Sequence, residues 1–249
     1  MLLIYTQKIT PRFTYVFKHI CTRILGIEIK FTNAIETFIA EEGPKLSYGK
    51  QPLGNELFLQ SHIILSHQGI ESVELTVKNW EETKCFFQVS DKSALPFDIF
   101  SASFYLLSRY EEYLPHVKDT YGRFTKEESL AFQSGFLHQP VIDLWAYKFK
   151  AALQIQYPNF EFDTRHFSIN PVIDVPVAYY FKNKGFLRTI GGIVSDLARF
   201  RLKFLYNRFP VLFGFKKDPY DNFKWIINRQ KTSQSKFNFF FSNREFNYI

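Results

Sequence analysis

Asp174 is the residue whose type and position best suit chemistry. It lies near the end of the apolar stretch Pro171 to Val175, which reads as a buried strand. Alternate residues of a strand project to one face, so a second carboxylate two positions later would complete a short acidic pair. Position 176 holds a proline instead. The stretch therefore indicates either a metal site that lacks a ligand or a strand end whose single aspartate binds nearby backbone N–H groups.

The histidines do not supply the missing ligands. The sequence contains 6 histidines, and none of them follows His166. His62 and His67 are five positions apart, a spacing that suits neither one face of a helix nor one face of a strand. We expect these two to be separate imidazoles at or near the surface, and we predict no metal ligands in this chain.

Charge is distributed unevenly along the 249 residues. The whole chain has 31 Lys+Arg and 24 Asp+Glu; residues 166–249 hold 14 and 5 of these, which leaves 17 and 19 before residue 166. A shift from −2 to +9 marks a domain boundary, and the segment 157–167 with Pro158 suits a linker. We predict two domains, residues 1–162 and residues 163–249.

The elements that must position these residues follow from hydrophobic periodicity. In the first domain we predict helices over 11–26, within 96–115 and over 140–157, and strands over 2–6, 27–31, 73–77 and 85–89. The last helix should bury Val141, Leu144, Trp145, Phe149 and Ala152. In the second domain we predict a strand over 171–175, a helix over 184–210 that Gly191 and Gly192 weaken or bend, a helix over 218–230 and a buried strand over 236–242. This order indicates repeated βα units with a parallel sheet.

Several stretches resemble a bacterial domain of unknown function that precedes polysaccharide deacetylase (NodB-homology) domains. The resemblance rests on "LPFDIFSASFYLLSRYEEYLPHVKDTYGRF" (95–124), "HQPVIDLWAYKFK" (138–150), "LLIYTQKITPRFTYVF" and "PKLSYGKQPLGNELF" (44–58). From "INPVIDVPVAYYFKNKGFLRTIGG" onward the chain is similar to the opening of the deacetylase domain. An eight-stranded barrel takes about 250 residues, so we expect residues 163–249 to be a truncated segment. The expected fold is a mixed α/β N-terminal domain followed by the first strand–helix units of an incomplete deacetylase-type β/α barrel.

The resemblance implies a chemistry for the family. Its enzymes hydrolyse N-acetyl groups on carbohydrate with a divalent, zinc-like metal, an aspartate as general base, a second aspartate as metal ligand and a His-x3-His pair. Asp174 matches the general base, whereas Pro176 occupies the place of the metal-binding aspartate and the histidine pair is absent. Because a catalytic site of this type needs three protein ligands, we expect this chain to hold no cofactor and to be inactive as a hydrolase.

Other functions remain open on the sequence. The first domain could persist as a non-catalytic binding or assembly module, with carbohydrate as the partner that the family implies. The basic amphipathic helix 186–206 is compatible with an anionic membrane surface, and the strand 236–242 with a protein partner or self-association through an exposed sheet edge. No nucleic-acid motif is present, so we do not expect nucleic acid as a partner. The sequence has no secretory signal and no long apolar segment, which leads us to expect a cytoplasmic protein.

Overall fold

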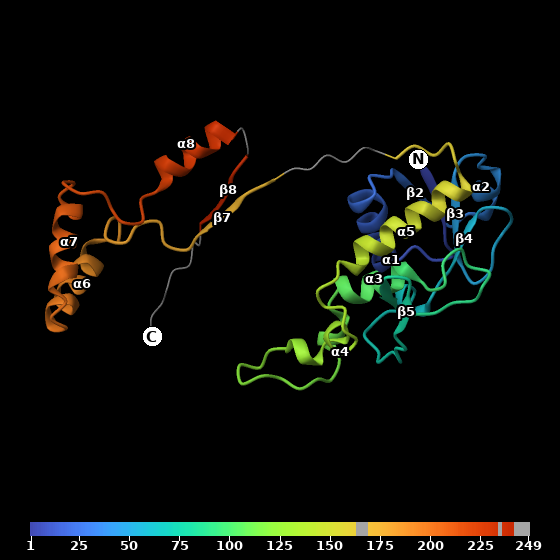
Figure 1. Ribbon diagram of the computed structural model, residues 1–249, viewed down its shortest axis with the longest axis horizontal. Helices are drawn as coiled ribbons and strands as arrows, with labels where there is room; N and C mark the ends of the chain where they lie inside the picture. Colours follow the sequence, from blue (N-terminus) through green and yellow to red (C-terminus); the bar gives the residue numbers. More distant parts are fainter. Residues whose placement is uncertain (163–168, 234–235, 242–249) are drawn as a thin grey trace. The chain divides into compact units, whose positions relative to one another are not determined.

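The chain divides into two units, Met1–Arg165 and His166–Ile249. The structure, a computed structural model, describes residues 1–162, 169–233 and 236–241 (Figure 1). Both units combine helices with parallel strands, which confirms the predicted mixed α/β class. The β/α barrel expected for the second domain stays a prediction. The expected boundary between residues 162 and 163 falls at residues 163–168, which lie outside the described part of the chain.

A parallel sheet organises the first unit. Its strands lie in the order β2 (Ile29–Thr32), β1 (Leu2–Tyr5), β3 (Lys45–Gly49) and β4 (Leu57–Gln60). Every neighbouring pair is parallel, with Leu2 opposite Ile29 and Leu46 opposite Leu57. The chain therefore moves from β1 to one neighbour and then crosses to the other side of β1 to form β3. The sequence predicts β1 and β2 but not β3 and β4.

Residue alternation gives this sheet two apolar faces. Leu2 and Ile4 of β1 point into the main core with alternate residues of β3 and β4, namely Leu46, Tyr48, Leu57 and Leu59. Tyr5 faces the other side, where its ring lies 5.4 Å from that of Phe38 in α2 (Ile35–Ala40). Strands covered on both faces are typical of parallel sheets in α/β proteins.

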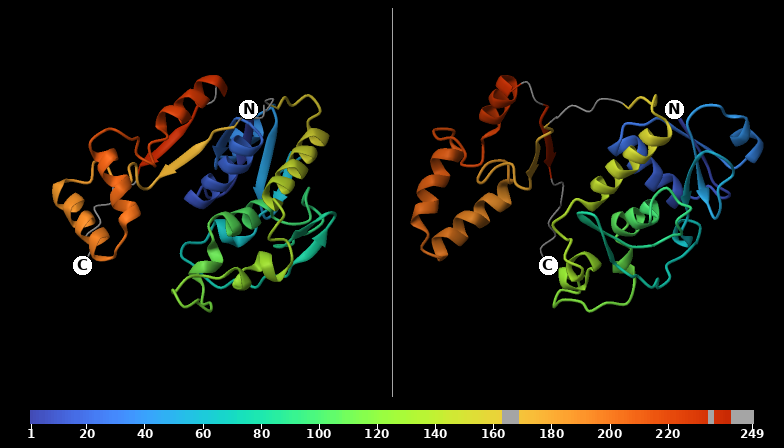
Figure 2. Two further views of the ribbon diagram at one scale, coloured as in Figure 1. Left: turned by 60° about the vertical axis from the view of Figure 1, so that its left-hand side comes forward. Right: turned by 45° about the vertical axis from the view of Figure 1, so that its right-hand side comes forward.

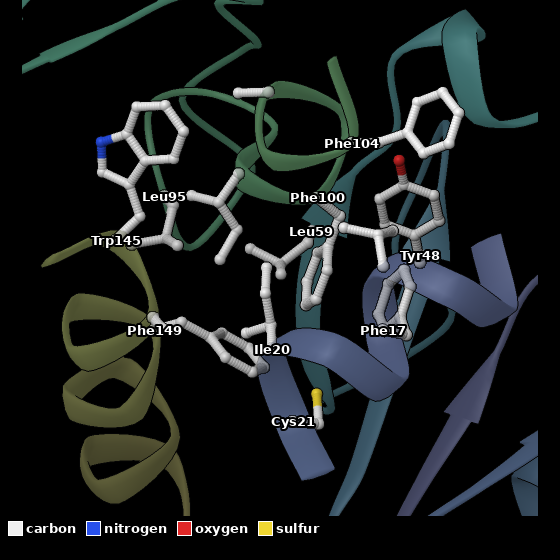
Figure 3. Close-up of a cluster of buried hydrophobic side chains, with 14 of the residues drawn as sticks. Phe17, Ile20, Cys21, Tyr48, Leu59, Leu95, Phe100, Phe104, Trp145 and Phe149 are labelled. Atoms are coloured by element: carbon white, nitrogen blue, oxygen red, sulfur yellow. The ribbon is translucent and has the colours of Figure 1, made fainter. Parts of the chain in front are cut away.

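The main core lies between the sheet and three helical segments: α1 (Pro11–Phe17) with its π-helical continuation η1 (Lys18–Ile24), α3 (Ile99–Leu107) and α5 (Val141–Gln156) (Figure 2). Thr10 caps α1 by accepting the N–H of Phe13 at 3.1 Å, with Pro11 at the first helical position. The core is aromatic, as Figure 3 shows: Phe17 and Phe100 stack with ring centroids 3.6 Å apart.

The helices agree better with the sequence than the later strands do. The predicted helix 11–26 is α1 plus the π-helical segment η1, and Gly26 follows it with φ of 68°. Helix α5 begins and ends as predicted, but Leu144 is exposed rather than buried. The predicted strand 73–77 is wrong: the chain instead forms a hairpin of β5 (Lys78–Trp80) and β6 (Thr83–Cys85). The predicted strand 85–89 is also wrong, because Phe87 has φ of 63° and breaks the extended run.

Short segments complete the first unit. These are the helix α4 (Leu130–Gln133) and three 3₁₀ segments, Ile63–Leu65, Tyr110–Tyr113 and Lys126–Glu128. The 3₁₀ segment Ile63–Leu65 directly follows β4 and contributes the buried side chains of Ile64 and Leu65 to the core.

In its described residues, the second unit contains one parallel pair of strands, β7 (Val172–Val175) and β8 (Asn238–Phe241). They are joined through α6 (Phe186–Ala198), α7 (Leu202–Leu212) and α8 (Phe223–Ser233). The predicted single helix 184–210 breaks after Ala198, where Phe200 has φ of 53°, and not at the two glycines, which lie inside α6. The prediction that both strands are buried is wrong: Val172 and Phe240 are each 60% exposed. Apolar composition permits burial, but little in this unit covers the strands.

Two buried carboxylates hold the second unit together. Asp218 accepts the backbone N–H groups of Tyr180 and Phe181, each at 2.8 Å. Asp196 of α6 pairs with Arg208 of α7, and both side chains are about nine-tenths buried. Within the described residues, no helix has the length and apolar character needed to cross a membrane.

Candidate functional site

A cavity of about 110 Å³ opens at the carboxyl edge of the parallel sheet in the first unit. Residues that follow three strands line it: Thr6, Gln7 and Lys8 after β1, Gly49 and Lys50 at the end of β3, and Ser61 and His62 after β4. It lies at the point where the strand order switches, between β1 and β3. Ligands of open α/β sheets bind in this place, because the loops after neighbouring strands diverge there and leave a crevice.

Asp98 holds two residues of the cavity lining, Tyr48 and His62, by hydrogen bonds. Its Oδ2 accepts the Tyr48 hydroxyl at 2.5 Å, the Ser101 hydroxyl at 2.6 Å and the backbone N–H of His62 at 2.6 Å. Its Oδ1 caps α3 by accepting the N–H groups of Phe100 and Ser101 at 3.1 and 3.0 Å. One carboxylate thus joins the ends of β3 and β4 to the start of α3.

Burial dominates the electrostatics of this network. Asp98 is 2% exposed, and its removal from water raises the pKa of the carboxyl group, although the hydrogen bonds that it accepts act in the opposite direction. Burial, with the charge of Asp98, raises the pKa of Tyr48 well above its ordinary value. Tyr48 is therefore a permanent donor, and Figure 3 shows its hydroxyl among aromatic side chains. Through their hydrogen bonds these groups hold Tyr48 and His62, which line the cavity, in place.

His62 presents an imidazole at the cavity. Its ring stacks on Phe87, with centroids 4.2 Å apart and an interplanar angle of 23°. The left-handed backbone of Phe87 is held by a hydrogen bond from the Asp98 N–H to the Phe87 carbonyl at 3.0 Å. Nδ1 of His62 is buried and has no hydrogen-bond partner in the part of the chain that the structure describes. Burial lowers the pKa of His62, so the ring is neutral at neutral pH.

Two lysines supply positive charge at this edge. Nζ of Lys50 donates to the Ser61 carbonyl at 3.2 Å, which holds the ammonium beside the cavity. Lys8 follows β1 on the opposite side of the strand-order switch and also lines the cavity. The arrangement offers hydrogen-bonding groups and cations around a small space, which suits the binding of a small polar group.

Asp174, the residue predicted to act as general base, lies on β7 in the second unit. It is exposed and stands opposite Phe240 of β8 in the register. Pro176 follows the strand. Among the described residues there is no group of three or more His, Cys, Asp or Glu side chains that could hold a metal ion. Within the described ranges, Asp174 therefore belongs to no such metal-ligand group.

His62 and His67, considered as a pair in the sequence, have separate environments. Nδ1 of His67 pairs with Glu71 at 3.3 Å, and both side chains are largely exposed. His62 instead belongs to the cavity wall.

Sequence reasoning missed Lys8, Lys50 and the role of Asp98, because β3 and β4 were not predicted. The signal that could have found them is polar residues directly after apolar strands, "TQK" at 6–8 and "SH" at 61–62.

Comparison with known proteins gives one relationship. No curated protein and no solved structure matches the chain. Residues 2–158, which include the whole parallel sheet, α3, α5 and the cavity, match a family of unknown function, DUF7033. Because this match covers more than half of the 249 residues, the chain belongs to the family of unknown function DUF7033.

Proposed function

We propose that this chain is a carbohydrate-binding protein related to the polysaccharide deacetylases, in which the first unit holds one substituent of a sugar in the cavity at the sheet edge. The observation that supports this most directly is the location of the cavity at the switch in strand order between β1 and β3, with side chains from three strand ends around it. The carbohydrate class comes from the resemblance of residues 95–124 and 138–150 to the domain that precedes deacetylases.

The volume of the cavity limits the size of the ligand group that it can hold. Pockets for drug-sized ligands are usually about 300–1,000 Å³, whereas this one is about 110 Å³. It suits a group of a few heavy atoms, so a sugar would insert one substituent and leave the rest of its ring outside. Ser61, Ser66 and Gln7 line the cavity and offer hydrogen bonds to such a group.

Binding accounts for the site better than hydrolysis does. The family reaction needs a metal held by three ligands beside a general base. Asp174 is exposed on β7, with Pro176 where the resemblance expects a metal-binding aspartate. We infer that the chain handles carbohydrate without hydrolysing it.

The binding test uses the full chain and a blocked variant. Calorimetric titration with a panel of neutral and acidic monosaccharides and with N-acetylglucosamine oligomers should give binding to at least one sugar. Ser61→Trp, at a half-exposed residue that lines the cavity, should abolish it. Ser134→Trp is the matched control, because Ser134 is also half-exposed but lies outside the cavity. Absence of binding to every sugar, or equal binding by Ser61→Trp, would contradict the proposal.

The inactivity of the chain has its own test. Incubation with N-acetylglucosamine oligomers and added zinc or cobalt should release no acetate. Turnover that disappears in Asp174→Asn would show that the chain is a hydrolase after all.

A further inference from the structure

The charge around the cavity is one-sided. Its lining residues, all of them in the described part of the chain, include two lysines and one histidine but no aspartate or glutamate. Lys8 and Lys50 are both exposed and can turn their ammonium groups toward a ligand. An ammonium acts as a compact point charge with three rotatable donors. The cavity therefore offers cations from two neighbouring strands, and no lining carboxylate neutralises them.

Asp98, a buried acid that contacts the cavity lining, does not cancel the positive charge of the two lysines. Asp98 lies behind Tyr48 and His62, and both of its oxygens are occupied by donors from the protein: three on Oδ2 and two on Oδ1. A carboxylate with this many donors has its charge compensated locally. It also accepts the Tyr48 hydroxyl, so that this donor is already used within the protein.

The imidazole of His62 adds a specific contact. Its Nδ1 is buried without a partner in the described chain, and buried polar atoms without partners are rare in folded proteins. Stacking on Phe87 fixes the plane of the ring. His62 lines the cavity, and an imidazole donates to an anion through whichever nitrogen carries the proton.

We propose that the cavity binds the anionic group of an acidic sugar, a carboxylate or a phosphoryl group, between Lys8, Lys50 and His62. This inference rests on the proposed carbohydrate-binding function and names the class of ligand. A single anionic group fits the cavity volume of about 110 Å³. Lys50 is already held at the Ser61 carbonyl, so one of the two cations is positioned before the ligand arrives.

Titrations of the full chain at low salt with four probes test this: glucose, glucuronate, glucose 6-phosphate and inorganic phosphate. We expect glucuronate or glucose 6-phosphate to bind at least tenfold more tightly than glucose, and the preferred one of the two identifies the source of the anionic group. Lys8→Met and Lys50→Met should each weaken that binding about fivefold, as for an ion pair near the surface. Lys92→Met is the matched control, because Lys92 is exposed in the same unit but does not line the cavity.

The outcomes separate this inference from the proposed function. Glucose binding as tightly as the acidic sugars, in a way that Ser61→Trp abolishes, would overturn the anion site and keep the carbohydrate-binding function. Inorganic phosphate binding as tightly as the sugar phosphate, with the same dependence on Lys8 and Lys50, would support the anion site and contradict carbohydrate recognition. If none of the probes binds, or if the lysine variants bind like Lys92→Met, the anion site is wrong.

Discussion

Tyr48 donates its hydroxyl to Oδ2 of Asp98 at 2.5 Å, and this bond joins the end of β3 to the N-cap of α3 inside the core. The same oxygen accepts the N–H of His62, which lines the cavity after β4. The packing of the first unit and the geometry of its candidate site therefore depend on one buried carboxylate. Changes at this carboxylate should affect stability and binding together, whereas changes at the cavity rim should affect binding alone.

Removal of the Tyr48 hydroxyl should destabilise the first unit. Tyr48→Phe removes one of the donors to the buried Oδ2 of Asp98. Because a buried acceptor then loses a hydrogen bond, we expect the free energy of unfolding to fall by about 1–2 kcal/mol. Tyr147→Phe, at a side chain that is 55% exposed, should change it little. In a Trp225→Phe background the remaining tryptophans, Trp80 and Trp145, both belong to the first unit, so urea unfolding followed by fluorescence measures this unit. Equal effects of the two tyrosine variants would contradict the role assigned to the bond.

Asp98 should make the stability of the first unit depend on pH. Burial raises the pKa of its carboxyl group above the ordinary value of 3.8, so the folded state holds this proton more tightly than the unfolded state does. The stabilisation is fully present below pH 3.8 and is lost as the pH rises through the pKa of the folded state. We expect the free energy of unfolding to fall over that window in the wild type relative to Asp98→Asn. Urea titrations of both proteins across the acidic range measure the difference, and parallel curves would exclude it.

His62 should make binding of an acidic sugar stronger at acidic pH. Burial lowers the pKa of its imidazole from 6.5, the charge of Asp98 acts in the opposite direction, and Lys50 adds to the lowering. The ring is therefore neutral at pH 7 and gains a proton below 6.5, where it adds positive charge to that of Lys8 and Lys50. Affinity for glucuronate, whose carboxylate stays ionised in this range, should rise in calorimetry as the pH falls below 6.5, and the rise should disappear in His62→Gln. A pH dependence that His62→Gln retains would assign it to another group.

Part of this structure could be predicted from the sequence because the signals are local. Trp145 and Phe149 recur at helical spacing after Pro140, and both lie buried on α5. The contacts of Asp98 with Tyr48 and His62 join residues 50 and 36 positions apart, and no local pattern predicts such pairs. Asp98 could thus be placed at a helix start but not at the cavity.

In the second unit, local sequence patterns predict buried strands that the structure shows to be largely exposed. The apolar runs that contain Val172 and Phe240 suggest buried strands, because apolar side chains usually avoid water. Burial, however, requires a covering element, and the sequence of a strand does not say whether one is present. Phe223 of α8 contacts β8, with its ring centroid 6.4 Å from that of Phe239 and 6.1 Å from that of Phe241.

The second unit should be digested by trypsin before the first. Its helices expose apolar side chains such as Leu187, which is 83% exposed, and few of its residues are buried, so local opening costs little. Arg188 and Arg199 offer cleavage sites in and beside α6. Mass spectrometry of a time course should detect cuts beyond residue 185 first, with a fragment close to residues 1–162 surviving. Persistence of the intact 29.5 kDa chain, or first cuts inside residues 1–162, would contradict this.

The two adjacent glycines of α6 should respond in opposite ways to the same substitution. A Cβ at Gly191 meets nothing within 4 Å, so Gly191→Ala should stabilise the helix by about 0.5–1 kcal/mol through its better helix propensity. A Cβ at Gly192 would collide with the guanidinium of Arg208, which pairs with Asp196 and lies 5.1 Å from the Phe181 ring centroid.

Gly192→Ala must therefore displace Arg208 from a largely buried pair, and an unpaired buried charge costs more than the gain in propensity, which leaves a net loss of about 1 kcal/mol or more. Hydrogen exchange over residues 186–198 measures both changes: protection should rise in Gly191→Ala and fall in Gly192→Ala. If protection rises equally in both variants, the ion pair contributes nothing to the contact between α6 and α7.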